Sequence, residues 1–247
     1  YEMALKIKSG HQVARVNKLH LQSQICDWTA LTQDRDLIAT LGTSTESIEP
    51  FAILSLEDAP ERHRVRSQIF NKKLYGYKTP LPPAAKPSQK PQRLRIGYFS
   101  ADFYEHPVAY LMAKVLETHD RTRFEVYGYS IGPAKDDDMR QSLIRAFNVF
   151  VDVRDMNDEE VALLARQDKI DIAIDLNGYT ENSRTGIFAY RAAPVQINYL
   201  GYPGTMGADF IDYIIADQTL IPIDSQKFYS EKPIYLPHHY QAQDNTL

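Results

Sequence analysis

Hydrophobic and polar positions follow two different periods along this chain, and the period changes near residue 93. Before that point, apolar residues recur at spacings of three or four, which predicts amphipathic helices over residues 1–78. The apolar residues form three stripes: Ala4, Leu5, Ile7, Val13, Val16, Leu19 and Leu21; Ile25, Trp28, Leu31, Leu37, Ile38 and Leu41; and Val65, Ile69 and Leu74. The third stripe also contains Arg62, Arg64 and Arg66, and we interpret these arginines as the solvated face of its helix.

Residues 79–92 read TPLPPAAKPSQKPQ and contain five prolines with no apolar period. Proline fixes the backbone and removes a hydrogen-bond donor, so such a stretch favours an extended linker. We therefore expect a boundary here between the helical segment and a second domain over residues 93–247.

From Arg93 onward, short apolar runs alternate with helical stretches, which predicts a parallel sheet covered on both faces. Right-handed crossovers then give a Rossmann-like α/β fold. The dinucleotide fingerprint G-x-G-x-x-G is absent after the first strand, which removes most support for a dehydrogenase. Expected strands are 94–100, 124–130, 149–153, 171–176, 195–200, 211–216 and 233–236, and expected helices are 107–118, 137–147, 157–168 and 182–191.

Composition narrows the class of protein. The 247 residues carry a net charge of −4 and are 43 % hydrophobic, so a substantial core is expected, while nucleic-acid and membrane-surface partners are not. No apolar run is long enough to span a bilayer. The single Cys26 excludes an internal disulfide and favours a reducing, cytoplasmic location. Because the chain starts at Tyr1 without an initiator methionine, we expect a fragment of a longer protein.

Three expected strands end in unusual turns, at residues 100–107, 175–180 and 200–207. The first carries His106 just before Pro107, a residue suited to a first helical position. The second contains Asn177–Gly178, a tight-turn pair that we expect to leave Asp175, Tyr179 and Thr180 facing a cleft. The third, LGYPGTMG, is rich in glycine, and its backbone N–H groups can hold a sugar hydroxyl or a phosphate. Successive parallel strands place these loops along one sheet edge, where ligands bind.

Each turn also has a purely structural interpretation. A histidine before a proline is commonly a helix cap, and Asn–Gly and LGYPG are common turns. Adjacent His238 and His239 point apart on a strand, so one metal ion is not expected to take both. Asp171 and Asp175 are too far apart for a glycosidase pair. Nucleophile-elbow, zinc-protease and P-loop motifs are absent.

Segments in a fixed order resemble the O-GlcNAc transferase family, which includes bacterial tetratricopeptide-linked members and Spindly-type fucosyltransferases. The 191–217 segment is the most specific. The matching segments are CDWT (26–29), PFAILSLEDAPE (50–61), RLRIGYFSADFYEHPVAYL (93–111), DLNGYT (175–180), RAAPVQINYLGYPGTMGADFIDYIIAD (191–217) and YSEKPIYLPHHY (229–240).

The resemblance implies a GT-B architecture, in which two Rossmann-like halves face each other across a cleft. This chain would be the amino-terminal half with its preceding helical segment, residues 1–22 being the end of a tetratricopeptide array. The second half, which supplies most nucleotide contacts, and the array would lie elsewhere in the polypeptide. Inverting, metal-independent transfer of a sugar from UDP-GlcNAc or a related donor to protein Ser/Thr is implied, with no cofactor.

Residue roles are carried over by motif from the resemblance. His106 matches the histidine beside the transfer centre, a candidate base and acceptor contact. Asp175 stands where animal members have Asn, and His239 where Thr is expected. The residues that would line the substrate and donor cleft are Asp102, Asp175, Asn177, Gly178, Tyr179, Thr180, Leu200, Gly201, Tyr202, Pro203, Gly204, Thr205 and His238.

Two functional hypotheses remain open at this point. The chain is half of a protein glycosyltransferase and is inactive alone, or it is a non-catalytic module that retains the fold and binds partners through its helices. The sequence does not determine the donor sugar, the acceptor proteins, the oligomeric state or whether the full-length protein is active.

Overall fold

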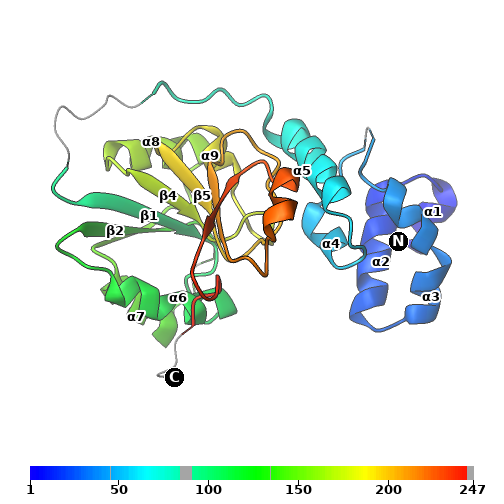
Figure 1. Ribbon diagram of the computed structural model, residues 1–247, viewed down its shortest axis with the longest axis horizontal. Coiled ribbons are helices and arrows are strands. Elements are labelled where there is room, and N and C mark those ends of the chain that lie inside the picture. The colour runs from blue at the N-terminus through cyan, green and yellow to red at the C-terminus, as the bar shows by residue number, and fades with distance from the viewer. Residues whose placement is uncertain (45, 84–90, 134, 244–247) are drawn as a thin grey trace. The chain divides into compact units, whose positions relative to one another are not determined.

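The computed structural model describes residues 1–44, 46–83, 91–133 and 135–243 (Figure 1). The chain divides into two compact units, each described by itself below. One comprises Tyr1–Tyr77, Gly204–Ala208 and Lys227–Ser230, and the other Lys78–Pro203, Asp209–Gln226 and Glu231–Leu247. Of the expected linker at 79–92, residues 84–90 lie outside the described residues, and 79–83 and 91–92 form no helix or strand.

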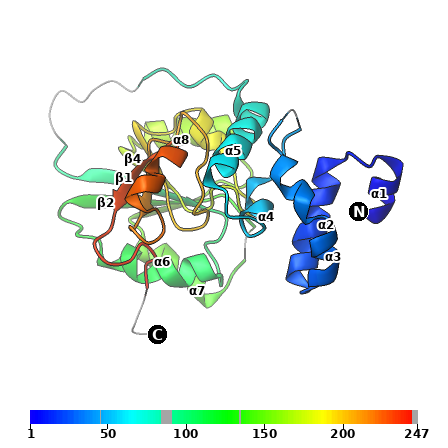
Figure 2. The same cartoon turned by 45° about the vertical axis from the view of Figure 1, so that its right-hand side comes forward.

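The first unit is helical (Figures 1 and 2). The elements are α1 (Glu2–Ile7), α2 (Gln12–Gln24), α3 (Trp28–Gln33), the 3-10 helix η1 (Arg35–Thr40), α4 (Pro50–Leu54) and α5 (Pro60–Tyr75). Helices α2 to α5 begin at a proline or at a side-chain cap: Pro50 and Pro60 occupy first-turn positions of α4 and α5, and Asp27 accepts a hydrogen bond from the Ala30 N–H at 3.0 Å at the start of α3.

The apolar stripes locate these helices, but part of each stripe is exposed. Val16 and Leu19 of α2 are buried against Ile38 and Ile53, forming this unit's core. Ile25 and Trp28, in contrast, are 72 % and 58 % exposed. The expected second helix is broken into α3 and η1, whose backbone changes conformation at Asp34.

Arg66 corrects one expectation, because its side chain is completely buried and does not belong to a solvated face. Its guanidinium donates to the carbonyls of Leu41 and Ile38 at 2.7 and 2.8 Å and pairs with Glu57. A buried cation needs such partners, since unpaired burial is very costly. Arg66 therefore links α5 to the preceding turns, a role that apolar periodicity cannot reveal.

The second unit is built on a seven-stranded parallel sheet in the order β3-β2-β1-β4-β5-β6-β7. All seven expected strands are present with ends within two residues of those predicted. This confirms the Rossmann-like α/β fold. The strands are β1 (Leu94–Ser100), β2 (Phe124–Ser130), β3 (Val149–Asp152), β4 (Ile172–Asp175), β5 (Val195–Asn198), β6 (Tyr213–Ala216) and β7 (Lys232–Tyr235).

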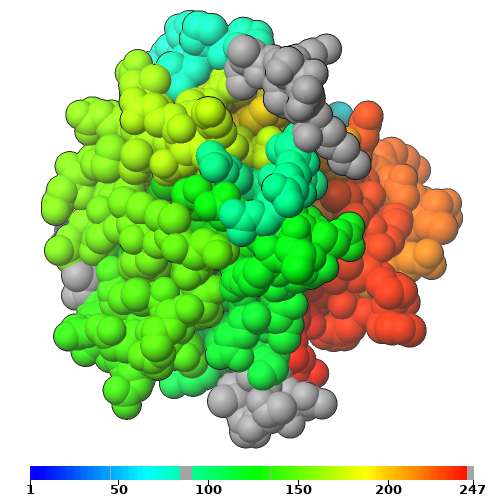
Figure 3. All heavy atoms as spheres, turned by 90° about the vertical axis from the view of Figure 1, so that its left-hand side faces the viewer, coloured from blue at the N-terminus to red at the C-terminus, as the bar shows by residue number. Residues whose placement is uncertain are grey.

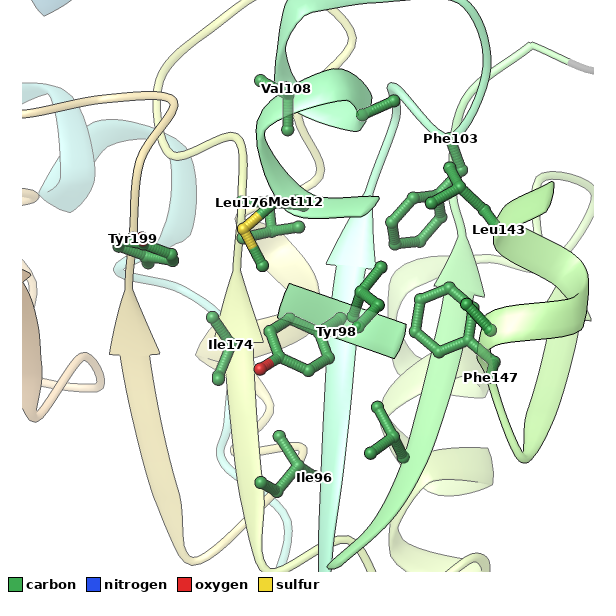
Figure 4. Close-up of a cluster of buried hydrophobic side chains, with 14 of the residues drawn as sticks. Ile96, Tyr98, Phe103, Val108, Met112, Leu143, Phe147, Ile174, Leu176 and Tyr199 are labelled. Carbon is green, nitrogen blue, oxygen red and sulfur yellow. The ribbon is translucent and has the colours of Figure 1, made fainter. Parts of the chain in front are cut away.

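Helices cover both faces of the sheet, α6 and α7 on one side and α8 and α9 on the other (Figure 1). On the first face, Tyr98 of β1, Ile174 of β4 and Tyr199, which directly follows β5, pack with Met112 of α6 and Leu143 of α7 (Figure 4). The helices are α6 (Pro107–Thr118), α7 (Asp138–Ala146), α8 (Asp158–Gln167) and α9 (Gly186–Ala189), and the 3-10 helix η2 spans Ile223–Phe228.

The helix expected at 182–191 is reduced to the four residues of α9. Residues 181–185 instead form turns, with Asn182 at a φ of 58°. A left-handed residue interrupts an α-helix, so the helix starts only after it. No helix in the described part of the chain is long and apolar enough to cross a membrane.

Strand order determines where a ligand can collect. From β1 the chain moves outward through β2 and β3, then returns so that β4 pairs with the other side of β1. The loops that follow β1 and β4 therefore diverge at a topological switch point. In open α/β sheets the crevice at this point is the usual ligand site.

Candidate active site at the carboxyl edge of the sheet

The loop after β1 delivers Asp102 and His106 to the switch point. The Asp102 N–H donates to Ser100 Oγ at 3.0 Å, which turns the chain at the end of the strand. His106 is the N-cap of α6, where its Nδ1 accepts from the Val108 N–H at 3.3 Å. The same Nδ1 lies 3.8 Å from Asp102 Oδ2. The imidazole is about one-third exposed, at 35 %, whereas the Asp102 side chain is only 10 % exposed.

Asn177, after β4, joins the two loops of the switch point. Its Oδ1 accepts from the Ala101 N–H at 2.7 Å, and its Nδ2 donates to Asp102 Oδ2 at 2.7 Å. Nδ2 also lies 3.2 Å from Thr180 Oγ1, which in turn donates to the Asn177 carbonyl at 3.1 Å. Asn177 is fully buried, so these bonds hold Asp102 in one position.

Asp175, which the sequence was expected to leave facing a cleft, is buried in this chain. It is 2 % exposed, and its Oδ1 accepts from the N–H groups of Asn177 and Gly178 at 2.9 and 3.0 Å. Burial raises its pKa to about 6, and the two backbone hydrogen bonds oppose that rise. Gly178 takes the left-handed conformation, with φ 60°. Asp175 thus forms the tight turn that positions Asn177.

The third loop begins with a strained residue, Leu200, at a φ of 74°. Gly201 follows, and a Cβ there would lie 2.2 Å from the Leu176 carbonyl oxygen, so only glycine fits without a backbone shift. Tyr202 packs its ring edge-on against Tyr179, with ring centroids 5.3 Å apart. These contacts bring the loops after β4 and β5 together beside the switch point.

Other predicted site residues are not joined to this group by the contacts described. Within the third loop the chain leaves the sheet unit after Pro203, so Gly204 and Thr205 belong to the helical unit. There Thr205 Oγ1 accepts from the N–H groups of Gly207 and Ser230 at 3.2 and 3.1 Å. His238 follows β7 at the same sheet edge and is exposed.

Asn198 is a buried polar residue at this edge that the sequence interpretation did not single out. It ends β5 in register with Asp175, and its Nδ2 donates to the Tyr202 carbonyl at 2.8 Å. Its Oδ1 and the Oδ2 of Asp175 are both buried without a described partner. The only signal in the sequence is an asparagine at the end of the short strand VQIN.

Among the described residues, no three His, Cys, Asp or Glu side chains gather closely enough to hold a metal ion. A cavity of about 850 Å³ lies at the opposite, amino-terminal edge of the sheet, on the side from which the chain enters β1 (Figure 3). Among its charged lining residues, Arg95 bonds to Glu125 at 3.1 Å and Arg166 donates to the Pro82 carbonyl at 2.8 Å.

A buried Asp–Asn pair beside a part-exposed histidine lies at the switch point of a Rossmann-like sheet, the position at which open α/β sheets usually bind ligands. Comparison with known sequences makes the class specific. Residues 60–246 match glycosyl transferase family 41, and the chain belongs to that family.

Relatives of known name agree with this assignment. The chain is 41 % identical over 171 residues to a probable UDP-N-acetylglucosamine–peptide N-acetylglucosaminyltransferase, SEC, of Arabidopsis thaliana, covering 66 % of this chain and 18 % of that protein. It is 42 % identical over 172 residues to the UDP-N-acetylglucosamine–peptide N-acetylglucosaminyltransferase of Caenorhabditis elegans, covering 68 % and 15 %. The chain thus spans less than a fifth of these curated relatives.

A solved structure extends the likeness to the fold. A mutant O-GlcNAc transferase of Thermobaculum terrenum matches 96 % of this chain and 40 % of its own, with a TM-score of 0.71 and 29 % identity.

Proposed function

We propose that this chain is the amino-terminal part of the catalytic region of an inverting glycosyltransferase that transfers GlcNAc, or another sugar, to Ser or Thr hydroxyls of proteins. The observation that carries the proposal is His106, part-exposed at the switch point beside Asp102. The names of the related proteins, which specify UDP-N-acetylglucosamine and peptide, support the choice of donor and acceptor class.

Residues 93–247 form the catalytic half in this proposal, and residues 1–78 form the end of a tetratricopeptide-like region joined to it by the linker at 79–92. A second Rossmann-like half elsewhere in the polypeptide holds most of the nucleotide. The share of the solved relative that this chain matches, 40 %, leaves room for such a half. The single cysteine accords with a cytoplasmic protein.

The chemistry requires three things: a positioned hydroxyl, a proton acceptor and stabilisation of the departing diphosphate. His106 is the group in this chain placed to contact the acceptor hydroxyl. No described residue bonds its Nε2, which leaves that nitrogen available to the substrate. The leaving group is stabilised by the second half, so no metal or other cofactor is required.

The first test uses this chain alone. Calorimetric titration with UDP and with UDP-GlcNAc is expected to show a Kd no tighter than ~1 mM, because the main donor site lies outside it. Sugar transfer is expected to be undetectable. Micromolar affinity would place the donor site here and refute the division between two halves.

The second test uses the full-length protein. His106→Ala is expected to lower kcat by ~10²–10⁴-fold, the usual contribution of a general acid or base, while donor affinity changes less than about threefold. His20→Gln, a substitution in α2, serves as the matched control and should leave both parameters unchanged. Equal losses in kcat and donor affinity would assign His106 to donor binding instead. Absence of transfer in the unmodified full-length protein would favour a non-catalytic interaction module.

A further inference from the structure

Two groups compete for one nitrogen of His106. The Val108 N–H donates to Nδ1 from 3.3 Å, and the Asp102 Oδ2 oxygen lies 3.8 Å from the same nitrogen. An imidazole nitrogen accepts a hydrogen bond when it is unprotonated and donates one when it is protonated. Nδ1 therefore cannot satisfy the amide and the carboxylate at the same time.

The choice decides what the other ring nitrogen can do. When Nδ1 accepts from Val108, the proton of the neutral ring sits on Nε2, which then faces the substrate as a donor. When Nδ1 carries the proton and donates it to Asp102, Nε2 has a free lone pair. Only this second state lets His106 remove a proton from a hydroxyl.

The surroundings hold the carboxylate more firmly than the ring. Asp102 Oδ2 is bonded to the buried Asn177, which is itself held by the Ala101 N–H. The His106 side chain is 35 % exposed, so it has room to turn. A movement of about 0.8 Å brings the pair from 3.8 Å to a normal N–H···O distance of roughly 3.0 Å.

We propose that Asp102 is a positioning residue, held by Asn177, which takes the Nδ1–H of His106 as a hydrogen bond and so leaves Nε2 as the proton acceptor for the substrate hydroxyl. This inference rests on the proposed function. In the step it serves, the hydroxyl proton passes to Nε2 while the hydroxyl oxygen bonds to the anomeric carbon. The bond from that carbon to the diphosphate breaks, the diphosphate leaves with the electron pair, and Asp102 stabilises the resulting imidazolium.

Charged and polar groups around the His106–Asp102 pair affect the pKa of Asp102. Burial raises the pKa of Asp102 and nearby Glu181 adds to the rise, while His106 and the hydrogen bonds from Asn177 and Tyr104 oppose it. From the next loop, Lys135 lies 3.9 Å from the centre of the Tyr104 ring, and Asp137 accepts from the Glu105 N–H at 2.9 Å. An ionised carboxylate has about four lone-pair sites, so Asp102 can accept the Nδ1–H in addition to its bonds from Asn177 and Tyr104.

Asp102→Asn is the decisive substitution, because it keeps the shape of the side chain and removes its negative charge. The oxygen that faces Nδ1 is the same Oδ2 that accepts from Asn177, so an amide oxygen there still accepts from Asn177 but is a weaker acceptor for the Nδ1 proton. The variant should therefore shift the ring toward the tautomer with its proton on Nε2. Asp155→Asn is the matched control, since the Asp155 side chain is 94 % exposed.

The first readout needs no enzymatic activity. ¹⁵N NMR of the imidazole in this chain, assigned with His106→Gln, measures which nitrogen carries the proton. We expect a measurable Nδ1–H fraction in the unsubstituted chain and in Asp155→Asn, falling at least threefold in Asp102→Asn. Equal tautomer populations in all three proteins would overturn the proposal. If Asp102→Asn does not fold, Asp102→Ser removes the same acceptor and should show the same fall.

The second readout is kinetic and uses the full-length protein. Asp102→Asn should lower kcat by ~10²-fold or more and change KM for donor and acceptor less than threefold. An unchanged kcat, or a loss confined to KM, would refute the positioning role. If the unmodified full-length protein transfers no sugar, the proposed function fails, and the NMR result still decides whether Asp102 controls the ring.

Discussion

Asn177→Ala should destabilise the sheet unit strongly, although the substitution removes only one small side chain. The amide is fully buried and makes three hydrogen bonds with described residues: from the Ala101 N–H, to Asp102 Oδ2 and with Thr180 Oγ1. With alanine at this position, the Ala101 N–H and the Asp102 carboxylate stay buried and each loses its hydrogen bond to residue 177. The loops after β1 and β4 are then no longer joined.

The magnitude follows from those partners. An unsatisfied buried N–H at Ala101 costs about 1–3 kcal/mol, and a hydrogen bond to the Asp102 carboxylate contributes about 1.5–3 kcal/mol. Thr180 is only partly buried, so water can replace that bond at little cost. Groups in one network are not additive. We therefore expect a loss of roughly 3 kcal/mol in the free energy of unfolding.

Urea unfolding of this chain, followed by far-UV circular dichroism, provides the measurement. With a urea dependence of roughly 2–3 kcal/mol per molar, the midpoint of the sheet unit should fall by about 1 M. Gln167→Ala, which removes an exposed amide from α8, is the control and should shift the midpoint little. Amide exchange in α2 and α5 serves as an internal reference for the helical unit.

A loss below about 0.5 kcal/mol would refute this reasoning, because the buried N–H of Ala101 would then have found another acceptor. A loss of the expected size with unchanged exchange in the loops after β1 and β4 would also contradict it. In that case the network would not be what joins the two loops.

Three further expectations concern single residues. Asp175 is buried, with its pKa raised to about 6 from an unfolded value near 4, so its ionisation lowers the stability of the fold as pH rises through that window. Asp175→Asn should therefore raise the unfolding free energy at pH 7.5 by about 1–3 kcal/mol and have little effect near pH 4. Thermal unfolding at both pH values measures this difference. Gly201→Ala should lower the Tm of this chain by several degrees in calorimetry, because a Cβ would lie 2.2 Å from the Leu176 carbonyl oxygen; an unchanged Tm would mean the loop relaxes freely. Arg66→Ala should destabilise the helical unit by about 3–5 kcal/mol, because it removes the buried cation that pairs with Glu57. Hydrogen exchange should then rise in α5 but not in β1. Arg154→Ala, at an exposed arginine, is the control.

Much of the architecture follows from local patterns in the sequence. The run Leu94–Ser100 is apolar, short and followed by polar turn residues, and it forms β1 with the predicted ends. Pro107 begins α6 as expected, since its fixed φ suits the first helical turn and its missing N–H costs nothing there. Repeated alternation of strands and helices was sufficient to predict the parallel sheet, because few topologies satisfy short, right-handed connections.

The partners of buried polar groups were decided only by tertiary structure. Asp102 and Asn177 are 75 residues apart, and nothing local distinguishes their bond from two ordinary turn residues. The same holds for Arg66, which resembles its solvated neighbours in sequence and is buried because Glu57 and two carbonyls surround it. The spacing of hydrophobic residues indicates which face of a helix or strand is apolar. It carries no information about which distant group will form a hydrogen bond with a buried polar side chain.

In the candidate site, too, the sequence predicted one part and only the tertiary structure determined the rest. Sequence alone indicated that His106, Asn177 and Gly201 would follow strands that end at one sheet edge, and it is there that the structure places them. Asp175, expected from the sequence to face the cleft, is buried in this chain, and its carboxylate accepts two backbone N–H groups. Which polar side chain faces a substrate and which one forms the turn depends on backbone dihedrals such as the φ of 60° at Gly178, and these are settled only when the strands pack.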